Sequence, residues 1–242
     1  KTLEEQEKLN DAYTEIYLCK TPDKYYDTLV NVWLKRQVSL GKTWGRIYGK
    51  GFRDVMQDIT AFVSFDPPLA RKRILYALAH QYENGNPIRM YEPDYTHPYM
   101  DGAAWIPATL LSYLKETDDE SILDEDVRYL QSERSGTVLE HARRGIEFLL
   151  KSRGEHGLIL WGGGDWNDSV NNAGMLGKGE SVWLSIATVK AISEFTEVCA
   201  HYGRIPEVCE EYLAEREKLK GAIESYGFDK DHYIYGITDH GE

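Results

Sequence analysis

The chain has 242 residues, of which 42% are hydrophobic and 28% charged, a balance typical of a globular protein with a sizeable core. Its formal net charge of −12, without a clustered basic patch, argues against nucleic-acid binding, because phosphate contacts need grouped Lys and Arg. No apolar run approaches the roughly 20 residues of a membrane span and the start shows no apolar leader, so we expect no membrane partner and a cytoplasmic location.

Helical periodicity dominates the chain from its start to its end. The predicted helices cover residues 2–19, 23–41, 52–65, 66–84, 107–114, 138–150, 180–202 and 206–226. Asp66 followed by Pro67 is a typical helix start, and Thr137 with Glu140 forms a capping-box pattern. Strand patterns are few and short, at 158–161 and 232–235.

The connections between these helices indicate the fold class. Long polar, Gly-rich loops alternate with short connections, whereas the loops of a compact bundle are usually short. We therefore predict an all-α fold of helical hairpins arranged in a ring, with the segment 1–20 as a linker helix in front of it. Seven helices after that segment do not close a ring of hairpins, which favours part of a larger ring.

Cysteine and aromatic contents set two further limits. Cys19, Cys199 and Cys209 are too few and too scattered for a disulfide framework or a metal knuckle, so we expect no metal site and a reducing compartment. Six Trp and 17 Tyr are a high aromatic load. Core packing explains many such rings, but rings beside carboxylates also suit sugars. Composition leaves both interpretations open.

The first polar loop leads into the helix predicted at 52–65. Arg53, Asp54, Gln57 and Asp58 lie together there, with Asp54 and Asp58 one turn apart. Acids in a first helical turn and an Arg–Asp pair also stabilise ordinary helices. Gln57 and Asp58 lie among apolar neighbours, which equally suggests polar groups that point into a cavity. This segment alone does not distinguish a structural role from a functional one.

The second polar loop runs from Arg89 to Trp105 and contains two acids before Asp101, a histidine and several tyrosines. Asp101 is a candidate cap for the following helix. Between Tyr99 and Trp105, however, its apolar surroundings would raise the carboxyl pKa and keep it protonated near neutral pH. A general acid at a glycosidic oxygen needs that property.

The third polar loop contains three consecutive glycines and then Asp165-Trp166-Asn167-Asp168. The glycines permit close backbone approach, but no Lys-Ser/Thr follows, so this is not a phosphate loop. A ring between polar groups suits a sugar. Calcium is the competing ligand, and the spacing does not match an EF-hand.

Taken in order, these segments resemble the cellobiose phosphorylase family over about residues 21–205. The resemblance rests on Thr21-Pro-Asp23, Val30-Asn31-Val-Trp33-Leu34, Gly51-Phe-Arg53-Asp54 with Gln57-Asp58, Asp101 with Trp105, Gly164-Asp-Trp-Asn-Asp168 and Gly179-Glu-Ser-Val-Trp183. It implies an (α/α)6-barrel catalytic domain, here its N-terminal portion at 21–242. It also implies inverting phosphorolysis of a β-linked glucosyl or N-acetylglucosaminyl disaccharide, such as cellobiose, to an α-sugar 1-phosphate. Inorganic phosphate is then the co-substrate, without a cofactor, and a homodimer is possible.

The resemblance also implies roles for individual residues. Asp101 matches the catalytic acid that protonates the leaving oxygen. The substrate-binding positions implied are Arg53, Asp54, Asp58, Tyr99, Trp105, Asp165, Trp166, Asn167 and Asp168. Two departures stand against a full match. Gly102 replaces the second acid of an Asp-Asp pair, and neither the N-terminal β-sandwich of the family nor its phosphate-binding histidine and hydroxyl loop is recognisable.

Two other functions fit the same residues. An inverting glycoside hydrolase on this fold would need a second carboxylate as base, for which Glu92, Asp165 and Asp168 are candidates. A non-catalytic chain could bind sugar without turnover, or act as a helical scaffold for protein contacts. Phosphorolysis differs from hydrolysis because phosphate is already an anionic nucleophile and needs no activating base.

Overall fold

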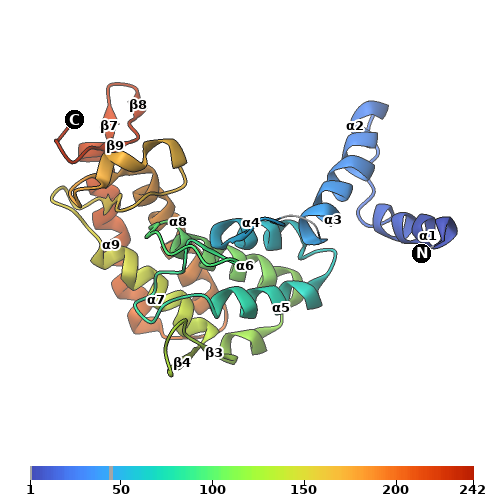
Figure 1. The fold of residues 1–242 in the computed structure, drawn as a ribbon. Coiled ribbons are helices and arrows are strands. Elements are labelled where there is room, and N and C mark those ends of the chain that lie inside the picture. Colours follow the sequence, from blue (N-terminus) through green and yellow to red (C-terminus); the bar gives the residue numbers. More distant parts are fainter. Residues whose placement is uncertain (1, 44–45) are drawn as a thin grey trace.

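The structure is a computed structural model that describes residues 2–43 and 46–242 (Figure 1). Its main helices are α1 (Leu3–Thr14), α2 (Lys24–Thr28), α3 (Lys35–Thr43), α4 (Phe52–Phe62), α5 (Pro67–Leu78), α6 (Trp105–Thr117), α7 (Val138–Lys151), α8 (Val182–His201) and α9 (Pro206–Ala222). Shorter helical segments are the π-helices η1 (Leu29–Leu34) and η5 (Ile223–Gly227) and the 3-10 segments η2 (Gly102–Ala104), η3 (Glu120–Asp124) and η4 (Asp168–Gly174).

The strands are short and belong to small antiparallel pairings. They are β1 (Lys50–Gly51), β2 (Met90–Tyr91), β3 (Asp126–Arg128), β4 (Ser135–Thr137), β5 (Ile159–Leu160), β6 (Glu180–Ser181), β7 (Phe228–Asp229), β8 (His232–Tyr233) and β9 (Gly236–Ile237). β1 pairs with β2, β3 with β4 and β7 with β8, while β6 lies between β5 and β9. These pairings fasten loops rather than build a sheet.

Every predicted helix forms, but several bounds differ. The first ends at Thr14 instead of residue 19, and the predicted linker starts at residue 1, which lies outside the described residues. The helix predicted from residue 180 begins at Val182, because Glu180 and Ser181 pair as a strand. The predicted strands are present as β5 and β8, whereas β1–β2 and β3–β4 were not predicted. The division between the linker helix and the catalytic domain at residues 20/21 stays a prediction.

Helix starts follow the predicted caps. The Asp66 side chain accepts a hydrogen bond from the Leu69 backbone N–H, with proline at the first helical position. The Thr137 hydroxyl accepts one from the Glu140 N–H at 3.1 Å. Such caps satisfy backbone donors that a helix start leaves without partners.

The body consists of two rows of helices that form an arc (Figure 1). Helices α4, α6 and α8 pack side by side in the inner row, and α5, α7 and α9 pack against them from outside. The polar loops lead into the N-terminal ends of the inner row. This architecture confirms the all-α prediction of helical hairpins and is consistent with part of an (α/α)6 barrel.

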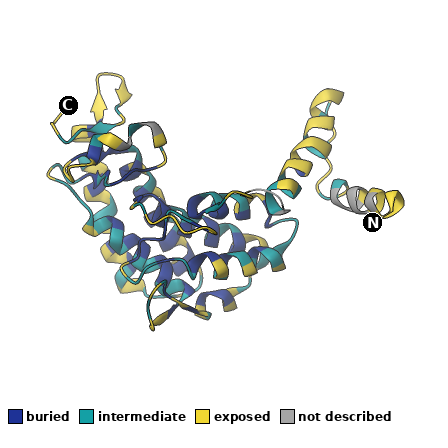
Figure 2. Ribbon diagram, in the orientation of Figure 1, coloured by how far each residue is buried: buried dark blue, intermediate teal, exposed yellow. Residues whose placement is uncertain are grey.

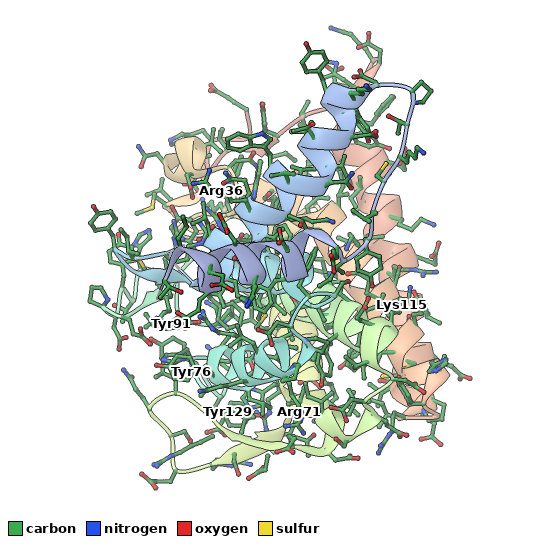
Figure 3. The ribbon with its side chains drawn as sticks, turned by 90° about the vertical axis from the view of Figure 1, so that its right-hand side faces the viewer. Arg36, Arg71, Tyr76, Tyr91, Lys115 and Tyr129 are labelled. Atoms are coloured by element: carbon green, nitrogen blue, oxygen red, sulfur yellow. The ribbon has the colours of Figure 1, made fainter. Side chains whose placement is uncertain are left out.

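Buried residues concentrate where the two rows of helices meet (Figure 2), and apolar side chains form the core there. Ile59 of α4, Ile106 of α6 and Ile192 of α8 are all fully buried, as is Ile74 of α5. Tyr91 packs edge to face on Tyr76 at 5.9 Å between ring centroids (Figure 3). Burial of these chains, at about 1.5–3 kcal/mol each, holds the inner helices in fixed relation.

The N-terminal arm, defined here as α1 to α3 (residues 3–43), projects from the body (Figure 1). Its second part is one run of helix from residue 24 to 43 with a π-helical stretch at 29–34. Tyr25 is 90% exposed and Trp33 50% exposed, and the Arg36 guanidinium lies over the Trp33 ring, 5.6 Å from its centroid. Tyr17 reaches the body, where its hydroxyl donates to Glu116 at 3.1 Å. In the described part of the chain, no helix is long and apolar enough to cross a membrane.

Candidate active site

Three acidic residues converge on the Arg53 guanidinium at the ends of the inner helices. Arg53 Nη1 donates to Asp101 Oδ2 at 3.1 Å and to the Asp165 carbonyl at 3.0 Å. Arg53 Nη2 donates to both carboxylate oxygens of Asp168 at 2.9 Å. One cation thereby ties together the start of α4 and the loops before α6 and α8. We call Arg53, Asp101, Asp165 and Asp168 the carboxyl cluster.

Asp101 is the buried acid of this cluster, with 1% of its surface exposed. Burial raises its carboxyl pKa, while Arg53 and the Trp105 N–H, which donates to Asp101 Oδ2 at 3.2 Å, oppose that rise. The predicted direction of the shift is therefore confirmed. The capping alternative is wrong, because the Asp101 side chain makes no cap hydrogen bond to η2.

Asp165 is held in place by close contact between two loops. The Gly163 N–H donates to the Pro98 carbonyl at 3.2 Å, and the Met100 N–H donates to the Gly164 carbonyl at 2.9 Å. A β-carbon on Gly163 would lie 2.7 Å from the Pro98 oxygen, so only glycine permits this approach. The prediction of close backbone approach is confirmed. Asp165 is fully buried beside Asp101 as a result.

Asp168 is the exposed acid of the cluster, with 57% of its side chain accessible. Arg89 approaches it from the loop before α6, with Nη2 3.6 Å from Asp168 Oδ1. The Arg89 guanidinium also lies 4.0 Å from the Tyr99 ring centroid, and Arg53 lies 5.7 Å from the same ring. Tyr99 and two arginines therefore form one wall of a small recess that Asp101 also lines.

Aromatic rings border the cluster on its other side. Trp166 is 48% exposed and stacks on Trp183, with ring centroids 5.8 Å apart and planes 18° apart. The Trp105 ring lies 6.3 Å from the Trp183 ring between centroids. The Asn167 N–H donates to Asp165 Oδ1 at 2.7 Å, whereas its side-chain Nδ2 is buried without a hydrogen-bond partner among the described residues. An unpaired buried donor costs about 1–3 kcal/mol, a cost that a bound ligand can remove.

Asp54 and Asp58 lie apart from the carboxyl cluster. Both pair with Arg46, at 3.7 Å for Asp54 and 3.1 Å for Asp58. At 100° per residue, these two acids point about 100° and 140° around α4 from Arg53. Burial raises the pKa of Asp58 and Arg46 opposes that rise. Their predicted role in sugar binding therefore has no support from contact with the other site residues and stays a prediction.

Glu92, one candidate base for a hydrolase, contacts other partners. Its carboxylate pairs with Lys50 and accepts a hydrogen bond from the Tyr76 hydroxyl, beside α5. Asp165 has both carboxylate oxygens engaged, by the Ser181 hydroxyl at 2.5 Å and by the Asn167 N–H. Of the three candidates, Asp168 alone combines exposure with membership of the cluster.

Sequence reasoning left two contributors without a role, Arg89 and Trp183. Arg89 opens the second polar loop and was the one cation in it, which was the available signal. Trp183 belongs to a quoted motif, but its contact with Trp166 depends on loop geometry that no spacing reveals. Across residues 2–43 and 46–242, no group of three or more His, Cys, Asp or Glu could hold a metal ion.

Comparison with known proteins adds an independent line of information. The family model for the catalytic domain of the glycosyl hydrolase 94 superfamily matches residues 10–242. The chain is 42% identical to a solabiose phosphorylase of Paenibacillus borealis, over 96% of this chain and 30% of the relative. It is 32% identical to a cellobionic acid phosphorylase of Neurospora crassa (91% and 29%) and 26% identical to an N,N'-diacetylchitobiose phosphorylase of Vibrio furnissii (92% and 32%). The chain therefore spans about a third of the length of these relatives.

Proposed function

This chain belongs to the glycosyl hydrolase 94 superfamily, a family with disaccharide phosphorylases among its members, and on that premise we propose that the whole protein catalyses inverting phosphorolysis of a β-linked glucosyl disaccharide. The products would be an α-sugar 1-phosphate and the released acceptor sugar. The observation that carries the proposal is the carboxyl cluster at the ends of α4, α6 and α8, next to exposed aromatic surface.

The proposed chemistry needs one carboxyl as general acid. Phosphate attacks the anomeric carbon from the face opposite the leaving group, while a carboxylic acid protonates the glycosidic oxygen. Asp101 is our candidate, because burial raises its pKa and favours the protonated form that a general acid requires. Phosphate would come from solution, with residues of the whole protein beyond this chain completing its site.

Asp168 is the alternative acid within the same cluster. A general acid must touch the glycosidic oxygen, and the Asp168 side chain is 57% exposed whereas Asp101 is almost completely covered. Asp101 would need the recess beside Tyr99 to admit the substrate, while Asp168 meets it directly. Exposure therefore favours Asp168 as the general acid, whereas the raised pKa favours Asp101. The second experiment below distinguishes the two.

Trp166 and Asn167 support binding of a sugar at this place. The exposed Trp166 ring offers a flat face to the C–H groups of a pyranose, and Asn167 Nδ2 is a free buried donor among the described residues. Cellobiose is one candidate substrate. Because the relatives named above include a solabiose phosphorylase at 42% identity, solabiose is an equal candidate. A homodimer stays a prediction.

The first experiment supplies the whole protein with cellobiose, solabiose, cellobionic acid and N,N'-diacetylchitobiose, with and without inorganic phosphate. We expect sugar 1-phosphate from at least one substrate, and only when phosphate is present. Free glucose released equally without phosphate would replace the proposal with a hydrolase, for which Asp168 is then the candidate base. Binding of a disaccharide without any turnover would favour the non-catalytic alternative.

The second experiment compares Asp101→Asn, Asp168→Asn and the control Asp231→Asn, a 90% exposed carboxylate that contacts His232. Loss of the acid should lower kcat by about 10²–10⁴-fold on an unactivated disaccharide. The loss should be much smaller on an aryl β-glucoside, whose leaving group needs no proton. The variant that shows this dependence on the leaving group identifies the acid. Near-normal turnover by Asp101→Asn would remove Asp101 from that role.

A further inference from the structure

The segment from Glu180 to Trp183 contacts the site loop at several points although no residue of it was assigned a role. Glu180 is buried and accepts hydrogen bonds from the His156 and Leu158 backbone N–H groups. Ser181 and Trp183 face the loop that carries Asp165 to Asp168. The segment pairs with β5 and β9, so its backbone is fixed from both sides.

Ser181 fixes the orientation of Asp165. Its hydroxyl donates to Asp165 Oδ2 at 2.5 Å and accepts from the Leu184 N–H at 2.9 Å as the N-cap of α8. Both residues are fully buried. The carboxylate that begins the Asp165–Asp168 loop is therefore attached directly to the start of an inner helix.

Trp183 contacts both of the other tryptophans of the site. Its ring stacks on Trp166 and lies 6.3 Å from the Trp105 ring between centroids, with those two planes 35° apart. Trp105 in turn donates its indole N–H to Asp101. Trp166 is half exposed, and among the described residues its stack on Trp183 is the aromatic contact that restrains its ring plane.

We propose that Trp183 is a positioning residue for the proposed reaction, setting the Trp166 ring against the sugar face. This inference rests on the proposed function. It assigns no contact between Trp183 and the reacting atoms. Its effect passes through Trp166, because a stacked partner confines a ring that solvent would otherwise leave free to change rotamer. Loss of Trp183 should therefore weaken sugar binding more than it slows the chemical step.

The test is a double-mutant cycle in the whole protein, with KM and kcat measured on the substrate identified above. Trp183→Leu should raise KM on the order of three- to tenfold, the range expected for one aromatic pair, and kcat should change less than KM. Trp183→Phe, which keeps a ring, should restore most of the affinity. In a Trp166→Leu background, Trp183→Leu should add less than twofold, since its target is gone.

The control is Trp33→Leu on the arm, which should leave KM and kcat unchanged. Trp33 is 50% exposed, close to the 48% exposure of Trp166. Additive effects of Trp183→Leu and Trp166→Leu would overturn the proposal, as would a loss confined to kcat. If Trp183→Leu does not fold, Trp183→Met takes its place in the cycle. If the wild type shows no phosphorolysis, the proposed function fails, and disaccharide affinity measured by calorimetry on the same variants tests Trp183 alone. No sugar binding by the wild type would overturn both.

Discussion

Arginine and apolar or aromatic side chains are buried around the carboxyl cluster but largely exposed on the N-terminal arm. In the body, the Arg53 side chain is 9% exposed and donates hydrogen bonds to two carboxylates and the Asp165 backbone carbonyl, while core apolar residues such as Ile59 are fully buried. On the arm, Arg36 lies over the half-exposed Trp33, and Tyr25 is almost wholly in water.

The difference shows what tertiary packing adds to a helical pattern. The sequence of the arm repeats apolar residues at helical spacing as α4 does, yet no residue of α2 or η1 is buried, and the arm packs on the body at α3 instead. In the body the same spacing is matched by neighbouring helices, and the cost of burying charge is offset by several short contacts around one guanidinium. The same kind of substitution should therefore change the free energy of unfolding much more in the body than on the arm.

Arg53→Ala should show the largest difference. Removal of one partner from a buried ion pair leaves Asp101 without its cation and should cost about 3–5 kcal/mol of unfolding free energy. Arg36→Ala on the arm should cost at most about 1 kcal/mol, because an exposed cation–π contact is weak. Urea unfolding of both variants measures the contrast. Equal small losses would mean that the cluster does not hold the helix ends together. Arg53→Lys serves if Arg53→Ala does not fold.

Trp105→Phe should shift a pH profile. The Trp105 N–H favours the ionised form of Asp101, so removing it raises the Asp101 pKa further above its ordinary value. If Asp101 is the general acid, activity is lost as pH rises through that pKa, and the alkaline limb of kcat/KM should move to higher pH in the variant. The measurement is kcat/KM from pH 5 to 9. An unchanged limb would remove Asp101 from the role of general acid.

Trp33→Ser should show the smallest effect in the series. Because the ring is half exposed and no residue of η1 is buried, the free energy of unfolding should change by about 0.5 kcal/mol or less. Thermal unfolding of the chain comparing Trp33→Ser with wild type checks this. A loss above 1 kcal/mol would show that the arm packs against something in solution.

Periodicity located most helices, because each of α4 to α9 buries one face. The resemblance to a known family, and not the three polar loops by themselves, placed Arg53, Asp101, Asp165 and Asp168 in one site. The resemblance also assigned Asp54 and Asp58 to sugar binding. In the structure both pair with Arg46 and point away from Arg53 around α4, so that role stays a prediction.

Other features depend on interactions that a sequence pattern does not display. The strands β1, β2, β3 and β4 are two or three residues long, too short for alternation to be visible. The π-helical stretch at 29–34 has ordinary helix-forming residues. The contact between Trp166 and Trp183 depends on how the loop that carries Trp166 lies against α8, which sequence spacing does not show. A local sequence pattern predicts which residues are buried. It predicts much less well which of them contact one another.

The pairing of β9 with β6 links the last residues of the chain to the loops before α8. The Asp239 carboxylate accepts hydrogen bonds from the backbone N–H groups of Leu176, Lys178 and Gly179, at 2.7–2.9 Å. Residues 236–239 therefore hold the loop that leads into Ser181 through a strand pairing and a carboxylate. Replacing Asp239 should loosen that loop although none of its own residues is changed.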